Sequence, residues 1–472
     1  MILKPILICC VSLFTLQTLA QCPLLSMNEV NSFASICTGV TLTSLPDQLG
    51  RPYLYVASKE EGLKVVDIQS TPQQVAQILT SSFSSLHVNS ITQQGYYLFL
   101  AVGNSFNNGQ SAGLVVIDVN DPENPVQTDF EIIPASSNGS GMVYVKGNRA
   151  YLAGMSDGVG VFDVSDVFNV NFIAQFIPDI NFPVQNPDPE KVNARCILVE
   201  DNFLYLCYDA GGLRVLDITD ENNISEIGHY SNPELDALPR AYNNLVKDGQ
   251  YLYVTVDYCG IEVIDVSNTS SPGLASWWNP WDCASNPFNW FSSPGHTNEL
   301  VLKEDCDVLF VATGKSDMYV LDVSNPLQPD SCDVFGGVDN NMGTWGVSMR
   351  GDSVYLSYVC AVIPFASNWT GIKVIDIETN CTTDVNGNCG RVTDVYPVPS
   401  KDQVFIVSDD VFQSGEWVDV MIYDESGRKL QSGQYQYSSN GLMISLEKFS
   451  PGLYFANCKN KVSSCRVKLI RQ

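Results

Sequence analysis

The feature that most constrains this chain is a short sequence motif, the repeat phrase, that occurs seven times, from GLKVVDI at residues 62–68 to GIKVIDI at residues 371–377. Each copy carries an aspartate near its end, and successive copies lie about fifty residues apart, a spacing typical of one four-stranded propeller blade per copy. The repeated aspartates are Asp67, Asp118, Asp163, Asp217, Asp265, Asp322 and Asp376. The repetition predicts an all-β chain whose residues 21–390 form one β-propeller.

Each copy of the phrase has apolar neighbours that complete a blade. A second strand precedes it, such as YLYVA at residues 53–57, and short apolar pieces come earlier still. Dipeptides typical of hairpin turns, such as Gly147-Asn148 and Asp201-Asn202, join these pieces. A fourth strand follows each phrase after a turn rich in Ser, Asn, Asp and Pro. Because the third position of the phrase varies widely, we expect the phrase strand to pack mainly on one side.

Both ends of the repeat array are incomplete, and the two deficits match. The first copy has few residues before it, and the last lacks a clear fourth strand after Asp376. If residues near Cys22 to Val30 supply that outer strand, the ring closes and no sheet edge is left unpaired. We therefore predict seven blades closed by the N-terminal segment.

The repeated aspartate has two interpretations. At the end of a strand, its carboxylate can accept backbone N–H groups of the following turn and so organise every blade alike. A shared ion site is the alternative. We favour the structural role.

The pattern of apolar residues, valine and aspartate resembles the LVIVD repeat of secreted and surface-located bacterial propeller proteins. The resemblance covers roughly residues 51–380. It implies the fold, and it brings no catalytic residues with it.

Residues 391–472 follow a different pattern of alternating strands and turns, which predicts a small Ig-like β-sandwich. The order and sequence of their motifs resemble the C-terminal sorting domain, type A, of the type IX secretion system of Bacteroidota. Three pieces carry the resemblance: Tyr396-Pro397, the IYDESGR turn at residues 422–428, and Pro451-Gly452-Leu453-Tyr454. Val398 departs from it, since that family usually has Asn there. The resemblance implies handling by the type IX secretion machinery and a cell-surface or secreted location.

The N-terminus indicates export as well. Residues 1–20 combine Lys4, an apolar run and a terminal Ala20, which is typical of a secretory signal peptide. The sequence Leu19-Ala20-Gln21-Cys22 allows a lipoprotein alternative. No stretch is long enough for a transmembrane helix. The net charge of −27 argues against a nucleic-acid partner.

Fifteen cysteines fit an oxidising compartment in which disulfides form. Counting outward from the turn Asp201-Asn202 places Cys196 opposite Cys207. The same count places Cys458 opposite Cys465. Cys381 and Cys389 bracket a short loop and are a third candidate pair.

Catalytic and metal-binding motifs are absent from the sequence. His87, His229 and His296 lie in different blades without ligand-like spacing, so we expect no metal site and no catalytic residues. The segment from Asp384 loosely resembles the start of a calcium loop, but it lacks the closing acidic ligand. A cystine-closed turn explains the same residues, and we expect no cofactor. Paired carboxylates for glycoside chemistry remain open as an alternative.

The longest interval between repeats has the most unusual composition, because it holds four of the seven tryptophans. Flat apolar rings are suited to stacking on sugars or anchoring a protein partner, whereas packing over the adjacent blade is the simpler interpretation. The candidate ligand-binding residues are Trp277, Trp278, Trp281, Phe288, Trp290 and Phe291. We expect a non-enzymatic module that binds an unknown protein or glycan; a polysaccharide-active enzyme and a structural surface-layer component are the alternatives.

Overall fold

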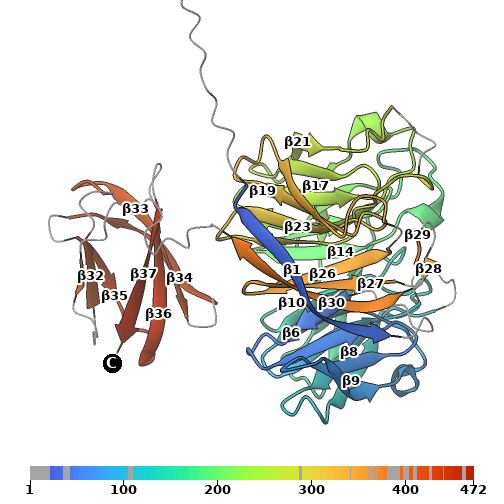
Figure 1. Ribbon diagram of the computed structural model, residues 1–472, viewed down its shortest axis with the longest axis horizontal. Coiled ribbons are helices and arrows are strands. Elements are labelled where there is room, and N and C mark those ends of the chain that lie inside the picture. Colours follow the sequence, from blue (N-terminus) through green and yellow to red (C-terminus); the bar gives the residue numbers. More distant parts are fainter. Residues whose placement is uncertain are drawn as a thin grey trace, which may run out of the picture.

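The structure, a computed structural model, describes residues 22–35, 43–104, 110–285, 290–340, 342–359, 361–362, 365–367, 369–379, 394–396, 403–407, 412–424, 428–438, 441–459 and 464–471. The described chain is almost entirely β-structure and contains no α-helix. Its strands form a propeller followed by a small sandwich (Figure 1). The fold class is therefore the one that the sequence predicts.

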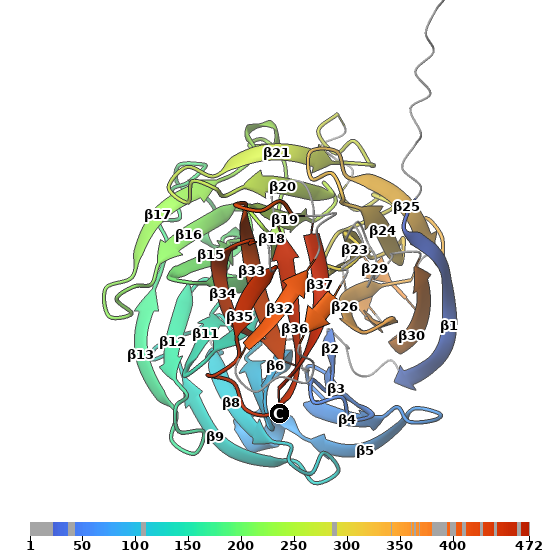
Figure 2. The same ribbon diagram turned by 90° about the vertical axis from the view of Figure 1, so that its left-hand side faces the viewer.

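Seven four-stranded sheets of the described chain surround a central axis (Figure 2). From the innermost strand outward, the first three are β2 (Thr43–Pro46), β3 (Tyr53–Ala57), β4 (Leu63–Asp67) and β5 (Gln73–Ile78); β6 (Val88–Gln94), β7 (Tyr97–Val102), β8 (Gly113–Asp118) and β9 (Val126–Ile132); and β10 (Val143–Lys146), β11 (Arg149–Ala153), β12 (Val159–Asp163) and β13 (Asn171–Phe176). The next three are β14 (Cys196–Glu200), β15 (Phe203–Cys207), β16 (Leu213–Asp217) and β17 (Ser225–Tyr230); β18 (Tyr242–Asp248), β19 (Tyr251–Val256), β20 (Ile261–Asp265) and β21 (Gly273–Trp278); and β22 (Leu300–Lys303), β23 (Val308–Ala312), β24 (Met318–Asp322) and β25 (Asp330–Phe335). The last is β26 (Thr344–Arg350), β27 (Ser353–Tyr358), β30 (Thr370–Thr379) and β1 (Leu24–Ser35).

The N-terminal strand completes the last sheet. β1 pairs antiparallel with β30, from Leu24 opposite Thr379 to Ser35 opposite Thr370. This pairing confirms the predicted ring closure and removes an open edge. A disulfide from Cys22 to Cys332 in β25 also ties β1 to the preceding sheet.

The expectation that phrase strands pack on one side is wrong. Lys64, Arg214 and Glu262 occupy the variable third position, and all three are buried. Neighbouring sheets pack face to face around the ring, so a phrase strand lies against protein on both faces. Burial of these polar groups is tolerated because each has a partner. The partners are Glu61, Glu226 and the hydroxyl of Tyr242, respectively.

The two faces of the propeller differ in their connections. On one face, which we call the tight-turn face, short hairpins such as Gly147-Asn148 and Asp201-Asn202 join the inner strands, as predicted. The opposite face, which we call the long-loop face, carries the connections from each outer strand to the next sheet. It also holds η1 (Thr80–Phe83), η2 (Pro189–Lys191), η3 (Pro233–Leu235), β28 (Ala361–Val362) and β29 (Phe365–Ala366).

The C-terminal residues form two sheets that pack together as a sandwich, as predicted. One sheet comprises β31 (Asp394–Tyr396), β32 (Gln403–Val407) and β35 (Leu442–Ser445); the other comprises β34 (Lys429–Gln436), β33 (Trp417–Asp424), β36 (Gly452–Lys459) and β37 (Ser464–Arg471). Ile406 and Ile444 from the first sheet share a core with Val420 and Ile422 from the second. In the described part of the chain, no helix has the length and apolar character needed to cross a membrane.

Candidate functional site

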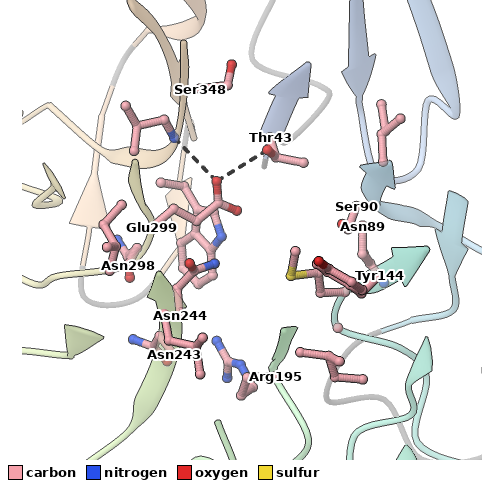
Figure 3. A pocket seen from close by; sticks show the side chains of 18 of the residues that line it. Thr43, Asn89, Ser90, Tyr144, Arg195, Asn243, Asn244, Asn298, Glu299 and Ser348 are labelled. Atoms are coloured by element: carbon pink, nitrogen blue, oxygen red, sulfur yellow. Dashed lines mark hydrogen bonds between the residues drawn. The ribbon is translucent and has the colours of Figure 1, made fainter. Parts of the chain in front are cut away.

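A cavity of about 400 Å³ lies in the central channel of the propeller. Its walls come mainly from the innermost strands and the residues just before them, and also from Lys59 and Met155 in connections on the long-loop face. Figure 3 shows the polar side chains that line it, which are contributed by all parts of the ring. These residues lie about fifty positions apart in the sequence and meet only because the ring closes.

Asparagines at the start of three inner strands fix neighbouring sheets to each other. The side-chain amide of Asn89 donates to the carbonyl of Ser140, at 2.9 Å. Those of Asn243 and Asn298 donate to the carbonyls of Thr297 and Thr344, each at 3.1 Å. In each case the acceptor belongs to the next sheet around the ring. Because the nitrogen of each amide is committed in this way, the orientation of the side chain is fixed as well.

Three polar atoms of the channel wall have no hydrogen-bond partner within the described structure. They are the side-chain oxygens of Asn89, Asn243 and Ser348. Asn89 is only 6% exposed. These oxygens have almost no accessible surface, and buried oxygens without a donor are costly to the fold.

Glu299 connects three sheets from inside the channel. Its Oε2 accepts hydrogen bonds from the hydroxyl of Thr43, at 3.2 Å, and from the backbone N–H of Val347, at 3.3 Å (Figure 3). Part of the side chain faces the cavity, yet protein surrounds it on all sides. This burial raises the pKa of Glu299 to about 8, although both hydrogen bonds oppose the shift. The carboxyl is therefore largely protonated at neutral pH.

Arg195 in the channel wall lies near a buried acid. Its guanidinium lies 3.8 Å from the carboxylate of Asp209, which also accepts a hydrogen bond from Asn193. Burial raises the pKa of Asp209 to about 6, and Arg195 opposes this rise. The pair places charges of both signs beside the cavity.

A further buried acid, Asp257, lies on the long-loop face. Its two carboxylate oxygens lie 2.5 Å from Nδ1 of His296 and 2.5 Å from the indole nitrogen of Trp290. The backbone of Asp257 has a positive φ of 44° and bridges to Thr297 of the next sheet. Asp257 therefore anchors the tryptophan-rich connection to the ring.

The tryptophans of that connection mostly serve packing. Trp277 donates to the carbonyl of Cys259 at 2.7 Å, and Trp278 is only 8% exposed. Trp281 packs edge-on against Trp278 and Tyr319. These contacts agree with the simpler interpretation, in which the rings cover the adjacent blade.

Phe291 differs from these tryptophans because it is 66% exposed. Its ring lies edge-on against Trp290, with centroids 4.7 Å apart. The indole is in turn hydrogen-bonded to Asp257. Phe291 is thus an exposed aromatic ring on a fixed support, whereas Phe288 lies outside the described residues.

The repeated aspartates organise turns, as predicted. Asp265 accepts the backbone N–H of Ser267 at 2.8 Å, and five other repeated aspartates make the same bond two residues ahead. Asp376 instead accepts from the hydroxyl of Ser353. The turn bonds hold the pKa of Asp265 below its usual value, and those of Asp163 and Asp217 likewise.

The predicted cysteine pairs have different outcomes. Cys196 lies directly opposite Cys207, as the turn count predicts, and Cys458 lies opposite Cys465. The structure keeps Cys196 and Cys207 as buried thiols, so this disulfide stays a prediction. That between Cys458 and Cys465 also stays a prediction. Cys381 and Cys389 lie outside the described residues, as does the calcium-like segment from Asp384.

Two disulfides that join described residues escaped the sequence analysis. Cys259 bonds to Cys283, and Cys22 bonds to Cys332. The second could have been inferred from the ring closure, because Cys332 lies on the outer strand beside the expected position of Cys22. A disulfide and a lipid thioether cannot share one sulfur, so this bond competes with the lipoprotein alternative.

The channel residues also escaped the sequence analysis, although a weak signal existed. Asn precedes the apolar part of three inner strands, at Asn89, Asn243 and Asn298. The three histidines do not come together, and no group of potential metal ligands was found in the described chain.

Two protein-family models match the chain. The model described as "LVIVD repeat" matches residues 52–79, 193–232, 243–279 and 294–331. The model described as "Secretion system C-terminal sorting domain" matches residues 394–472. No curated protein matches the chain.

Several solved structures are similar in fold. The beta-propeller domain of Cps50 (Swd1) from Myceliophteria thermophila has a TM-score of 0.52 at 11% identity, covering 75% of this chain and 100% of that one. YCF48 bound to D1 peptide has a TM-score of 0.49 at 12% identity, covering 77% and 100%. The computationally designed Ika8 protein has a TM-score of 0.44 at 8% identity, covering 74% and 99%. Together with the ring of four-stranded sheets, the family matches and the first of these structures show that the chain contains LVIVD repeats, a β-propeller and a C-terminal secretion-system sorting domain.

Proposed function

We propose that this protein is an exported, non-enzymatic binding module that contacts a protein or glycan through the long-loop face of its propeller. The observation that carries the proposal is the position of Phe291, an exposed ring held in place by Trp290 on that face. Rigidly supported aromatic rings are typical anchors of binding interfaces. The connection that carries Phe291 is also secured to its sheet by the disulfide between Cys259 and Cys283.

The direction of the chain supports the same face. β30 ends at Thr379 on the tight-turn face, and the chain continues from there toward the sorting domain. In Figure 1 the C-terminal sandwich lies to the left of the propeller, while β28 and β29 lie on its right. A propeller held through its C-terminal side would present the long loops outward.

The channel chemistry favours binding over glycoside hydrolysis. Hydrolysis of glycosidic bonds generally uses two carboxyl groups that flank the scissile bond. The described lining of the cavity includes Glu299 as its one carboxyl side chain. The enzyme alternative predicts release of reducing ends from polysaccharides, and such release by the purified chain would contradict our proposal.

Export is tested by removing residues 394–472, the range that matches the sorting domain. We expect the shortened chain to remain inside the cell, because the sorting domain supports type IX export. Immunoblots of culture medium, cell surface and cell interior measure this. Equal amounts of both chains outside the cell would contradict the route.

Binding is tested by substitution of two equally exposed rings on opposite faces. Phe291→Asp changes the long-loop face, and Phe168→Asp is the matched control, because Phe168 is 64% exposed and follows the turn after Asp163 on the tight-turn face. Glycan arrays and proximity labelling of intact cells measure partner contact. We expect loss of binding only in the Phe291 variant. Equal binding by both variants would remove this face from the proposal.

A further inference from the structure

Two neighbouring connections of the long-loop face are joined beside the exposed ring of Phe291. They are the tryptophan-rich connection (residues 279–299) and the connection from β25 to β26 (residues 336–343). The turn between β23 and β24 lies between their described parts. There Lys315 donates from Nζ to the carbonyl of Phe291, at 2.8 Å, and its own carbonyl accepts the backbone N–H of Asn340, at 2.7 Å.

A second bridge runs through Ser316 of the same turn. Its hydroxyl accepts the backbone N–H of Asp339, at 3.0 Å, and donates to the carbonyl of Pro294. Val338, the neighbour of Asp339, is an exposed apolar side chain. The two bridges make the surface around Phe291 continuous with the surface around Asp339.

Two acids of this surface are exposed. The carboxylates of Asp282 and Asp339 have no hydrogen bond or ion pair with any described residue. Asp282 follows Trp281, whose ring fills the space where a side chain at Gly295 would lie, so the two ends of the tryptophan-rich connection are held together. Lys315 is the one lysine or arginine of the two connections and the turn between them, and its ammonium is already bonded to a backbone carbonyl.

The rest of the long-loop face carries charge of the same sign. Glu60, Asp179 and Glu234 are exposed acids on other connections. Among the described residues of these connections, Lys191 is the one base that is exposed to the same degree, and its ammonium lies 3.6 Å from the carboxylate of Asp188. This charge attracts a cationic partner and repels an anionic one.

An aromatic ring beside carboxylates favours a particular cation. The face of an aromatic ring attracts ammonium and guanidinium groups. A guanidinium group can also stack on the ring while it donates hydrogen bonds to a carboxylate, because it is planar and has five donors. A neutral glycan would gain from the ring and nothing from the charges.

We propose that the long-loop face binds a basic segment of a partner protein, with an arginine side chain over the ring of Phe291 and beside Asp282 and Asp339. The inference rests on the proposed function, because it takes Phe291 as the anchor. It adds the chemical class of the partner, a cationic protein segment in place of a neutral glycan.

The test uses the full chain and three synthetic peptides that repeat Arg-Leu-Gly, Ser-Leu-Gly or Glu-Leu-Gly. Fluorescence anisotropy at low and at physiological salt measures binding. We expect only the arginine peptide to bind, with an affinity that falls as salt rises, since salt screens exposed charges. Equal binding of the serine peptide, or no binding of the arginine peptide at millimolar concentration, would overturn the proposal.

Substitution of the ring locates the site. Phe291→Leu keeps an apolar side chain but removes the ring, and should weaken binding of the arginine peptide by about threefold, the usual effect of one exposed cation–π contact. Phe168→Leu, on the tight-turn face, is the matched control and should leave binding unchanged. Undiminished binding in the Phe291 variant, or equal losses in the two variants, would place the peptide elsewhere and overturn the proposal.

The acids are tested as a pair. Asp282→Asn together with Asp339→Asn should weaken binding of the arginine peptide by about fivefold at low salt. Asp201→Asn together with Asp248→Asn removes the same charge from exposed positions on the tight-turn face, and therefore controls for attraction by the whole chain. Asparagine tolerates the positive φ of Asp201, Asp282 and Asp339. Equal losses in the two double variants would show binding by net charge alone and would overturn the proposal.

Proximity labelling of intact cells separates this inference from the proposed function. Loss of partner contact both in Phe291→Asp and in the double variant at Asp282 and Asp339 supports both proposals. Loss in Phe291→Asp alone would keep the binding face and contradict a basic partner. Contact that persists in Phe291→Asp would contradict the proposed function itself, and this inference with it.

Discussion

Two aspartates at opposite ends of strands β19 and β20 show how the faces of this propeller differ. Asp265, on the tight-turn face, accepts a hydrogen bond from the turn that follows it within the same sheet. Asp257, on the long-loop face, lies against Trp290 and His296, which belong to the connection to the next sheet. One aspartate organises its own sheet, and the other joins two sheets.

This difference explains why one position repeats and the other does not. The turn after the phrase strand leaves a backbone N–H that needs an acceptor, and an aspartate accepts it in six blades. The positions equivalent to Asp257 bridge to the start of the next innermost strand, beside connections of different length and composition. They are occupied by Lys59, Met155, Asp209 and Gly314. Variation at the long-loop face is therefore built into the architecture, and binding specificity can evolve there without loss of the fold.

The largest expected effect contrasts a buried arginine near the long-loop face with a partly exposed one on the tight-turn face. The Arg214 side chain has no exposed surface, and it contacts both carboxylate oxygens of Glu226, the carbonyl of Phe182 and the ring of Tyr208. Arg214→Ala should lower the free energy of unfolding by about 3–5 kcal/mol, because it leaves the largely buried carboxylate of Glu226 with only the half-exposed His229 beside it. Denaturant unfolding measures this.

Arg149 is the matched control for Arg214. It pairs with Glu221 and Asp163 on the tight-turn face, and its side chain is 31% exposed. Arg149→Ala should cost about 1 kcal/mol or less, since solvent screens such pairs. Similar losses in the two variants would break the comparison between the faces.

The next effect concerns Asp257 itself. Asp257→Ala removes the acceptor of Trp290 and the partner of His296, and should cost about 2–3 kcal/mol. It should also release the ring of Trp290, which would appear as a red shift of tryptophan fluorescence. Unchanged fluorescence with unchanged stability would mean that Asp257 does not hold the connection.

A third prediction uses the carboxyl in the channel. The pKa of Glu299 is raised from 4.5 to about 8, so between these pH values the unfolded chain loses a proton that the native protein keeps. The stability of the native protein therefore falls across this window as pH rises. Glu299→Gln removes the titration and should gain on the order of 2 kcal/mol at pH 9, after allowance for water in the channel, and almost nothing near pH 4. Thermal unfolding at several pH values measures this, and a gain that is independent of pH would contradict the burial of an acid.

Sequence reasoning was most effective where structure is set by neighbours in the chain. The alternation of apolar residues and the Asp turns predicted the sheets, because strands and hairpins depend on a few adjacent residues. The deficit at each end of the repeat array predicted the pairing of β1 with β30. Both inferences needed only the repeat.

The channel could not be predicted in the same way. Thr43, Glu299 and Val347 meet through hydrogen bonds although they come from three sheets, and none of them is unusual in its own repeat. Conversely, the tryptophan-rich interval attracted attention by composition, yet Trp281 is placed by Tyr319 and by the close approach of Gly295. Burial of a ring depends on partners that composition does not reveal.

The smallest expected effect returns to Asp265 and has the opposite pH signature to Glu299. Asp265→Ala should cost about 1 kcal/mol, the usual value of one hydrogen bond to a turn. Asp265→Asn should cost less, because Asn268 and Asn325 accept equivalent backbone bonds elsewhere in the ring. Since the turn lowers the pKa of Asp265, its carboxylate contributes stability above the unfolded value of 3.8, and this contribution is lost as pH falls through the native pKa. The difference between the native protein and Asp265→Asn should therefore disappear in acid, in thermal unfolding at matched salt. A difference that persists there would show that the charge of Asp265 has no part in the turn, and the contrast between the two faces would then rest on burial alone.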